Sequence, residues 1–309
     1  VRLCIYSQSQ LNQVVAETGV DYDGNTGGLL YFYRTLESFE AGAQKSEILR
    51  RNGIEIEILD REALIAKDPA LAPAREHLAG GLYAVTDESG DAHLFTQGLA
   101  RRCAEMGANL RMNTEIKGLV ASGQRIETLE TSEGRVTGDI YVLALGIYSP
   151  HLLRQLGLDL PIYPIKGYSV TLRMADGEDG PAIGGVDEDN LLAYCPMRRR
   201  LRVTATAEFA GYDNSHRPKD FQVMLARTKD LFPTAVDYSE PSYWAGLRPM
   251  TPTGLPIIDR SPYENLFLNT GHGHMGWTMS CGSASILADL VMQRTPELDL
   301  AGMRYEDVH

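Results

Sequence analysis

The sequence predicts a mixed α/β fold (α+β) in which a partial Rossmann-like domain is interleaved with an antiparallel-sheet domain. An apolar run at residues 140–145 ends at Gly146, as a buried parallel strand does at the ligand-binding edge of a sheet. Between residues 162 and 244, short strands rich in β-branched and aromatic residues follow one another, which is typical of an antiparallel sheet. A length of 309 residues allows one large or two medium domains.

The first ninety residues are expected to alternate between helices and strands. The periodicity predicts helices at residues 3–17, 35–52 and 60–68, and strands at residues 29–34 and 54–58. Gly53 suits the C-terminal end of the second helix, and Pro69 ends the third. Isoleucines alternate with glutamates in strand 54–58, so this strand is expected to bury one face.

From residue 92 the pattern changes. We expect helices at residues 95–106 and 219–232, and strands at residues 109–112, 140–145, 168–172, 191–196 and 201–209. Residues 1–90 and 161–246 are therefore assigned to the antiparallel-sheet domain. Residues 91–160 and 247–309 are assigned to the Rossmann-like domain.

A glycine-rich stretch, Asn269-Thr-Gly-His-Gly-His-Met-Gly-Trp-Thr-Met-Ser280, is the most informative part of the chain. A strand is expected to end at Leu268, and an apolar helical pattern continues to Met292. A turn between a strand and a helix start presents free backbone N–H groups and the positive end of a helix dipole. It is either an ordinary corner or a place for an anion or an electron-rich oxygen of a flat ligand.

Four further blocks accompany this stretch, and together the five resemble one flavoprotein family. The blocks are Asp87–Asp91, Asp139–Ser149, Pro161–Ser169 and Trp244–Ile257. They resemble the family of D-amino-acid dehydrogenases (small subunit), glycine oxidase and D-amino-acid oxidase, in the family's order, over residues 1 to 296. The resemblance implies FAD as cofactor and an FAD-binding Rossmann-like domain. It also implies oxidative deamination of D-amino acids by hydride transfer to flavin N5, which gives a 2-oxo acid and ammonia.

The resemblance also implies roles for single residues in substrate binding. Arg248, in Gly-Leu-Arg-Pro, matches the arginine that fixes the substrate carboxylate, for which a guanidinium fork is suited. Tyr194 and Tyr168 match the region whose tyrosines line the substrate pocket. From the residues alone, an arginine paired with Glu240 or Asp259 and tyrosines that pack in a core are the alternatives.

The cofactor-binding residues implied by the resemblance come from three places. They are Lys166, Gly146, Gly271, His272, Gly273, His274, Met275, Gly276, Trp277 and Thr278. His272 and His274 could be imagined as metal ligands, but no third ligand accompanies them, so we expect no metal.

The chain departs from the family in one respect. Family members begin with a strand, a Gly-x-Gly-x-x-Gly turn and a helix that bind the FAD pyrophosphate. We expect this element to be missing here, with roughly the first quarter to third of the family's fold. The chain would then be a fragment or subunit that is inactive alone, or a second polypeptide would supply the FAD-binding segment.

Other partners and alternatives remain open. The same scaffold also suits oxidation of glycine or of secondary amines such as sarcosine and (hydroxy)proline, and the electron acceptor is oxygen or a quinone or respiratory carrier. The net charge of −12 argues against a nucleic-acid partner. Four widely spaced cysteines suit a cytoplasmic protein. The run Arg198-Arg199-Arg200 is either a solvated turn or a peripheral contact with anionic lipid at the inner face of a bacterial membrane.

Overall fold

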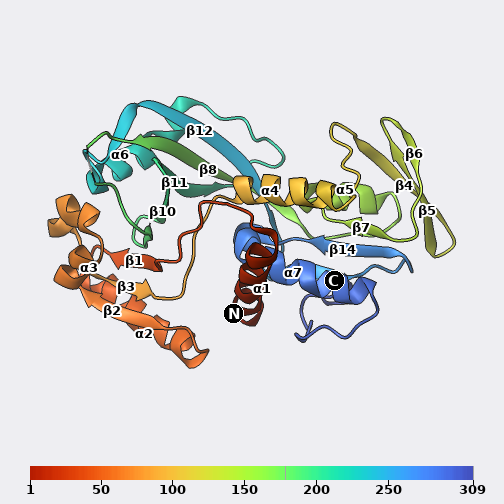
Figure 1. Ribbon diagram of the computed structural model, residues 1–309, viewed down its shortest axis with the longest axis horizontal. Coiled ribbons are helices and arrows are strands. Elements are labelled where there is room, and N and C mark those ends of the chain that lie inside the picture. Colours follow the sequence, from red (N-terminus) through yellow and green to blue (C-terminus); the bar gives the residue numbers. More distant parts are fainter. Residues whose placement is uncertain (178, 309) are drawn as a thin grey trace.

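The computed structural model describes residues 1–177 and 179–308. An eight-stranded sheet forms the left half of the molecule in Figure 1. Its strands in spatial order are β12 (Val236–Met250), β8 (Tyr163–Met174), β11 (Arg200–Glu208), β10 (Leu192–Met197), β9 (Gly184–Asp187), β1 (Leu29–Tyr33), β3 (Gly80–Ala84) and β2 (Ile56–Asp60). Its neighbouring strands are antiparallel except β1 and β9, so the predicted antiparallel sheet is confirmed and includes strands from both sequence segments.

Two smaller sheets form the right half of the molecule (Figure 1). One consists of β13 (Ile257–Arg260), β14 (Leu266–Thr270) and β7 (Tyr141–Leu143), and β14 and β7 are parallel. The other is an antiparallel meander of β4 (Ile116–Ser122), β5 (Arg125–Thr131) and β6 (Gly134–Val136). The apolar run before Gly146 therefore forms a parallel strand, as the sequence predicts.

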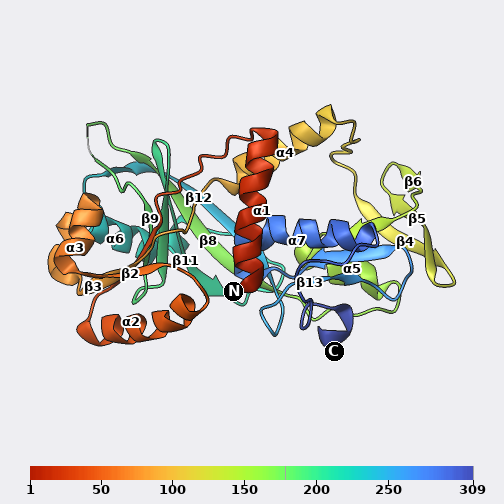
Figure 2. The same ribbon diagram turned by 60° about the horizontal axis from the view of Figure 1, so that its bottom comes forward.

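The helices cover the sheets and join the two halves. The α-helices are α1 (Arg2–Thr18), α2 (Leu36–Arg51), α3 (Arg61–Lys67), α4 (Ala92–Glu105), α5 (Ser149–Arg154), α6 (Gln222–Leu231) and α7 (Gly276–Val291). Short 3-10 turns are η1 (Pro69–His77), η2 (Gly146–Tyr148), η3 (Pro218–Phe221), η4 (Gly273–Met275) and η5 (Tyr305–Val308). Figure 2 shows α1 crossing α7 in the middle of the molecule. There the Ser7 hydroxyl accepts a hydrogen bond from the Gly282 N–H at 3.0 Å, because Gly282 has no side chain to keep α1 away.

The large sheet has two different faces because side chains alternate along each strand. One face, the core face, carries Val170, Leu172 and Val203, which pack with Phe221 and Phe232 from the α6 region. The opposite face, the inner face, carries Gly167 and Ser169 of β8 and the side chains opposite them on β11 and β12. The inner face is where the candidate site is formed.

One predicted strand is wrong, and one strand is buried differently from the prediction. Residues 109–112 form no strand, and Leu110 and Met112 are exposed, because no described strand lies beside them to complete a ladder. Helix α4 starts at Ala92, three residues before the prediction, because the Asp91 carboxylate accepts hydrogen bonds from the N–H groups of His93 and Leu94. In β2, Ile56 is buried but Ile58 is exposed.

Candidate functional site

Arg248 lies on the inner face of β12, where a glycine leaves room for its side chain. Its guanidinium lies directly over Gly167 of β8, in the space that a side chain at this position would fill. A β-bulge between Ala205 and Ala207 turns Thr206 to a φ of 72°, an uncommon angle for a β-branched residue. The Thr206 carbonyl then accepts a hydrogen bond from Arg248 Nη1 at 3.4 Å. Backbone features of three strands therefore fix the orientation of one guanidinium.

Arg248 forms no ion pair with any described residue. Neither Glu240 nor Asp259 is its partner, and the Asp259 carboxylate accepts hydrogen bonds from the N–H groups of Arg260 and Tyr305 instead. Burial of the Arg248 guanidinium, with no carboxylate beside it, lowers the pKa of Arg248. A partly buried guanidinium whose fork is free of protein carboxylates is suited to an anion that comes from outside the chain.

The glycine turn, Gly271–Gly276, lies beside the end of β12. This strand ends at Met250, two residues beyond Arg248. Gly271 and Gly273 have φ angles of 76° and 58°, which glycine adopts at little cost. A Cβ on Gly271 would come within 2.8 Å of Thr251, and a Cβ on Gly273 within 2.9 Å of Met250. The turn leads into η4 and α7, whose N-terminus has no side-chain cap. Its first N–H groups are therefore free to donate hydrogen bonds to a ligand.

His272 holds this turn on α7. Its Nε2 lies 2.9 Å from the hydroxyl of Ser283, which is fully buried. Burial lowers the pKa of His272 to about 4, so the ring is neutral near pH 7. Neutral His272 anchors the turn without adding a charge, and the described residues contain no cluster of ligands that could hold a metal ion.

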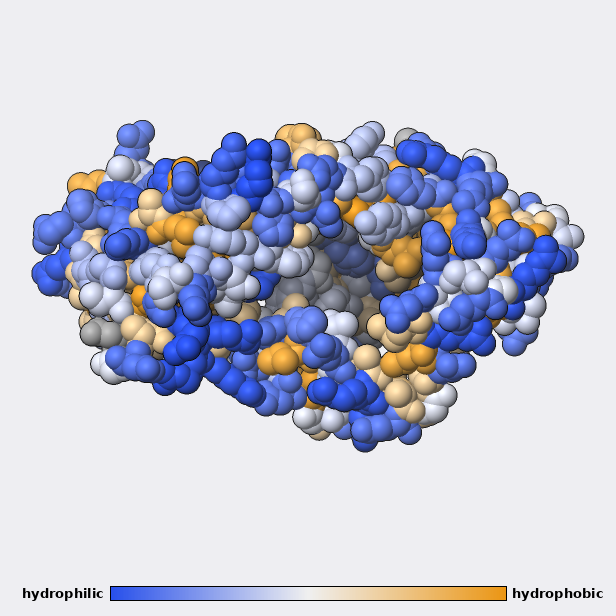
Figure 3. Space-filling view, turned by 90° about the horizontal axis from the view of Figure 1, so that it is seen from above, coloured by the Kyte–Doolittle hydropathy of each residue, from blue (hydrophilic) through white to orange (hydrophobic). Residues whose placement is uncertain are grey.

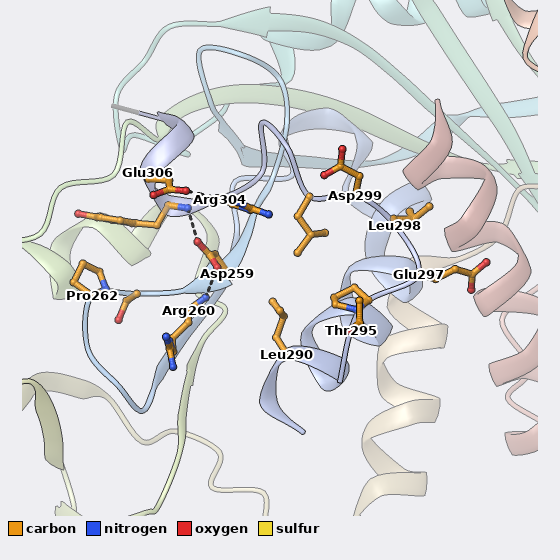
Figure 4. A pocket seen from close by; sticks show the side chains of 14 residues that line it. Asp259, Arg260, Pro262, Leu290, Thr295, Glu297, Leu298, Asp299, Arg304 and Glu306 are labelled. Atoms are coloured by element: carbon orange, nitrogen blue, oxygen red, sulfur yellow. Dashed lines mark hydrogen bonds and ion pairs between the residues drawn. The ribbon is translucent and has the colours of Figure 1, made fainter. Parts of the chain in front are cut away.

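The molecule is hollowed near its middle when seen from above (Figure 3). A cavity of about 260 Å³ opens next to the end of β12, between Gly146, Tyr148 and Pro249. Gly146 has a φ of 54° and touches the Pro249 ring, so it lies close to Arg248 in the fold. A second cavity, of about 760 Å³, lies between Arg260, Leu290 and the C-terminal segment (Figure 4). It shares no residue with the glycine turn.

Comparisons with known proteins agree with this arrangement. The family described as FAD dependent oxidoreductase matches residues 1–290. The chain belongs to this FAD dependent oxidoreductase family. D-amino acid dehydrogenase 2 of Mesorhizobium japonicum is 45% identical over 306 residues, which cover 99% of this chain and 74% of that protein. D-amino acid dehydrogenase of Granulibacter bethesdensis is 44% identical over 98% of this chain and 72% of its own length.

Solved structures show the same fold. Glycine oxidase from Geobacillus kaustophilus aligns with a TM-score of 0.90 and 26% sequence identity over 99% of this chain and 82% of that one. L-proline dehydrogenase from P. horikoshii aligns with a TM-score of 0.85 at 17% identity over 99% of this chain and 82% of its own length. The predicted family and fold class are confirmed.

The glycine turn fits one part of FAD, the cofactor of this FAD dependent oxidoreductase family. The uncapped α7 N-terminus offers donors to the electron-rich oxygens of a flat ring, and Gly271 and Gly273 allow the turn to pack closely on Thr251 and Met250. Gly271, Gly273 and Gly276, between β14 and α7, have the Gly-x-Gly-x-x-Gly spacing of the element that is expected to be missing. No described strand follows α7, so the βαβ unit of a dinucleotide fingerprint is not completed there.

Three residues predicted for the site lie on the other side of the sheet. Tyr168 and Tyr194 are on the core face, where Tyr168 packs on Phe221 and Tyr194 packs on Phe232. Lys166 is also on this face, and its ammonium lies 3.9 Å from Glu208 and 3.8 Å from Asp213. The structure thus separates all three from Arg248 by the thickness of the sheet. Core packing, the alternative for the tyrosines, describes them correctly.

The remaining predicted cofactor residues lie at the start of α7, in two environments. The Trp277 ring packs against Phe95 at 5.3 Å and Tyr22 at 5.8 Å between ring centroids, so this side chain belongs to a cluster with α1 and α4. His274, Met275 and Thr278 are exposed at the N-terminal end of the helix. Only the latter three are free to meet a ligand with their side chains.

Sequence reasoning missed Trp244, Gly246 and Gly167 as site residues. Side chains alternate along a strand, so Trp244, Gly246 and Arg248 of β12 lie on one face. This alternation could be read from the Trp244–Ile257 block of the sequence.

The arginines of the basic run 198–200 all form ion pairs. Arg198 pairs with Asp21 and Asp23, Arg199 with Asp176, and Arg200 with Asp91 and Asp23. No helix in the described part of the chain is long and apolar enough to cross a membrane.

Proposed function

We propose that this protein oxidises D-amino acids with FAD as the hydride acceptor and that Arg248 holds the substrate carboxylate. The observation that carries the proposal is a guanidinium without a protein carboxylate, fixed over Gly167 beside the glycine turn. The proteins named D-amino acid dehydrogenase, 42–45% identical, support this substrate class. When bound, FAD supplies the acceptor for a hydride from the substrate α-carbon.

The chain's own residues bind and orient the substrate. Arg248 would form two parallel charge-assisted hydrogen bonds to the carboxylate over Gly167, with the α-carbon toward the glycine turn. The free N–H groups at the start of α7 would stabilise negative charge on the flavin ring, which Gly271–Gly276 would help to hold. The imine product then hydrolyses in water to a 2-oxo acid and ammonia.

Glycine or a secondary amine is the second candidate substrate class, favoured by the likeness to glycine oxidase. Both substrate classes present a carboxylate to Arg248, so the guanidinium alone does not separate them. Flavin reduction without oxygen by D-alanine, compared with sarcosine, distinguishes the two proposals. In the second half-reaction the electron acceptor is oxygen or a quinone carrier. Adding each of them to the reduced protein shows which one reoxidises the flavin.

A further part of the proposal is that the FAD pyrophosphate is held by a segment that pairs with β7. Among the described residues β7 pairs only with β14, and Val142 in β7 and the flanking Ile140 and Leu145 are exposed. Parallel strands are normally covered on both faces, so these apolar residues suit an added strand and helix from a second polypeptide or from another part of the protein. The 309-residue chain alone is then expected to hold FAD weakly. FAD retained stoichiometrically through dialysis by these residues alone would contradict this part.

A further inference from the structure

The inner face of β12 holds an exposed aromatic ring next to Arg248. The Trp244 indole lies directly over Gly246, and the Arg248 guanidinium lies directly over Gly167. These two glycines are opposite each other on β12 and β8. Opposite residues in antiparallel strands are about 5 Å apart, so the indole and the guanidinium are neighbours on one surface.

Trp244 is exposed, whereas Ser169 opposite it on β8 is buried. Its side chain is 54% exposed, although the ring is large and apolar and lies in the interior half of a long strand. Exposed aromatic rings on a rigid strand suit apolar groups of a ligand, because they give a wide contact area with little loss of conformational freedom. The exposed ring therefore offers a binding surface beside the carboxylate site.

The order of residues along β12 sets how a ligand would lie. Met250 and Thr251, at the end of β12, touch the glycine turn, while the Arg248 guanidinium and the Trp244 indole lie side by side over the paired glycines Gly167 and Gly246. An amino acid whose carboxylate is bound by Arg248 therefore has the indole beside it and the glycine turn toward the end of β12. If the α-carbon faces the turn, as the hydride transfer requires, the side chain lies over Trp244.

Arg202 closes the far side of this surface with a positive charge. Its guanidinium lies 5.4 Å from the centroid of the Trp244 ring. Arg202 forms no ion pair with any described residue, and burial is the first cause that lowers its pKa. A cationic side chain that reached past the indole would meet this charge in a partly desolvated place.

We propose that Trp244 determines substrate specificity: its indole forms the subsite for the amino-acid side chain and selects apolar, uncharged side chains, while Arg202 excludes cationic ones. The inference rests on the proposed function, because it takes Arg248 as the carboxylate site. It adds the chemical class of the side chain that the site accepts.

The first test compares substrates of different side chain in the FAD-bound protein. Trp244→Ala should lower kcat/KM for D-phenylalanine relative to D-alanine by about tenfold or more, while Trp244→Phe should keep most of the preference. Tyr243→Phe, the neighbouring ring on the core face, is the matched control and should leave the ratio unchanged. Arg202→Gln should raise kcat/KM for D-lysine relative to D-leucine. An equal loss for D-phenylalanine and D-alanine in Trp244→Ala, or no loss, overturns the inference.

A second test does not depend on turnover. The chain has two tryptophans, so Trp277→Phe leaves Trp244 as the only indole. In this protein, titration with phenylacetate should change the indole fluorescence, and titration with acetate over the same range should not. The same response to both ligands, or to neither, overturns the assignment of the side-chain subsite. If the unaltered protein oxidises no D-amino acid but phenylacetate still changes the fluorescence selectively, the proposed function fails while the subsite remains.

Discussion

Gly167→Ala tests the position of Arg248 without altering the arginine itself. The new methyl group would occupy the place of the Arg248 guanidinium, so the guanidinium must move off the strand. The φ of Gly167 lies outside the left-handed region, so alanine fits the backbone and should keep the strand intact. A hydrogen bond to a charged group contributes about 1.5–3 kcal/mol, and the loss of one bond to the carboxylate therefore corresponds to a roughly 10- to 150-fold lower kcat/KM.

Steady-state kinetics with a D-amino acid, together with the flavin content of the purified protein, measure this effect. We expect a higher KM for Gly167→Ala with unchanged flavin content and thermal unfolding. Gly138→Ala is the matched control, because the nearest atom to its new Cβ lies 3.5 Å away and the residue is remote from Arg248. Unchanged kinetics in Gly167→Ala would show that the guanidinium position over Gly167 has no part in substrate binding. Loss of flavin or of the fold in Gly167→Ala would show that the contact between Gly167 and the Arg248 guanidinium stabilises the structure and does not serve substrate binding.

The remaining predictions concern the arginine, the glycine turn and its histidines. Arg248→Ala should weaken substrate binding or turnover by roughly 2–5 kcal/mol, and Arg248→Lys should recover only part, with flavin content unchanged in both; loss of flavin from the alanine variant would argue against the assignment. Gly273→Val should lower flavin affinity and make the flavin harder to reduce, measured by a flavin titration and a redox potential, because a side chain there collides with Met250. Treatment with EDTA should leave activity unchanged; activity lost and then restored by zinc would bring His272 and His274 back as ligands. The pKa of His272 is about 4 in the folded protein but 6.5, its ordinary value, in the unfolded chain. Between these pH values the unfolded state binds more protons than the folded state. The free energy of unfolding therefore falls as the pH drops from 6.5 to 4. His272→Gln should remove this part of the pH dependence, at most about 3 kcal/mol, in urea unfolding followed across that range, and an unchanged slope would show that the ring is not buried as described.

The sequence predicted the helices, the parallel strand before Gly146 and the glycine turn, because each has a strong local signal. Periodicity marked α1, α2 and α7, and the glycines marked backbone angles that other residues avoid. Arg248 was found through the Gly-Leu-Arg-Pro block, and its place over Gly167 gives that block a physical reason.

The face on which each tyrosine lies could not be predicted. It depends on how β8 and β10 pair with β11, because Tyr168 lies opposite Ala205 and Tyr194 lies opposite Val203. The resemblance implied that both tyrosines line the pocket, but both lie in the core. The strand predicted at residues 109–112 failed for a related reason, because strand formation requires a neighbour that local sequence does not specify.

Anaerobic reduction of the protein-bound flavin tests the central claim most directly. With FAD added in excess and oxygen removed, D-alanine should bleach the flavin absorbance, sarcosine should not, and Arg248→Ala should fail to respond at the same D-alanine concentration. Bleaching by sarcosine but not by D-alanine would contradict the assignment to D-amino acids, and equal bleaching in Arg248→Ala would contradict the role of the guanidinium.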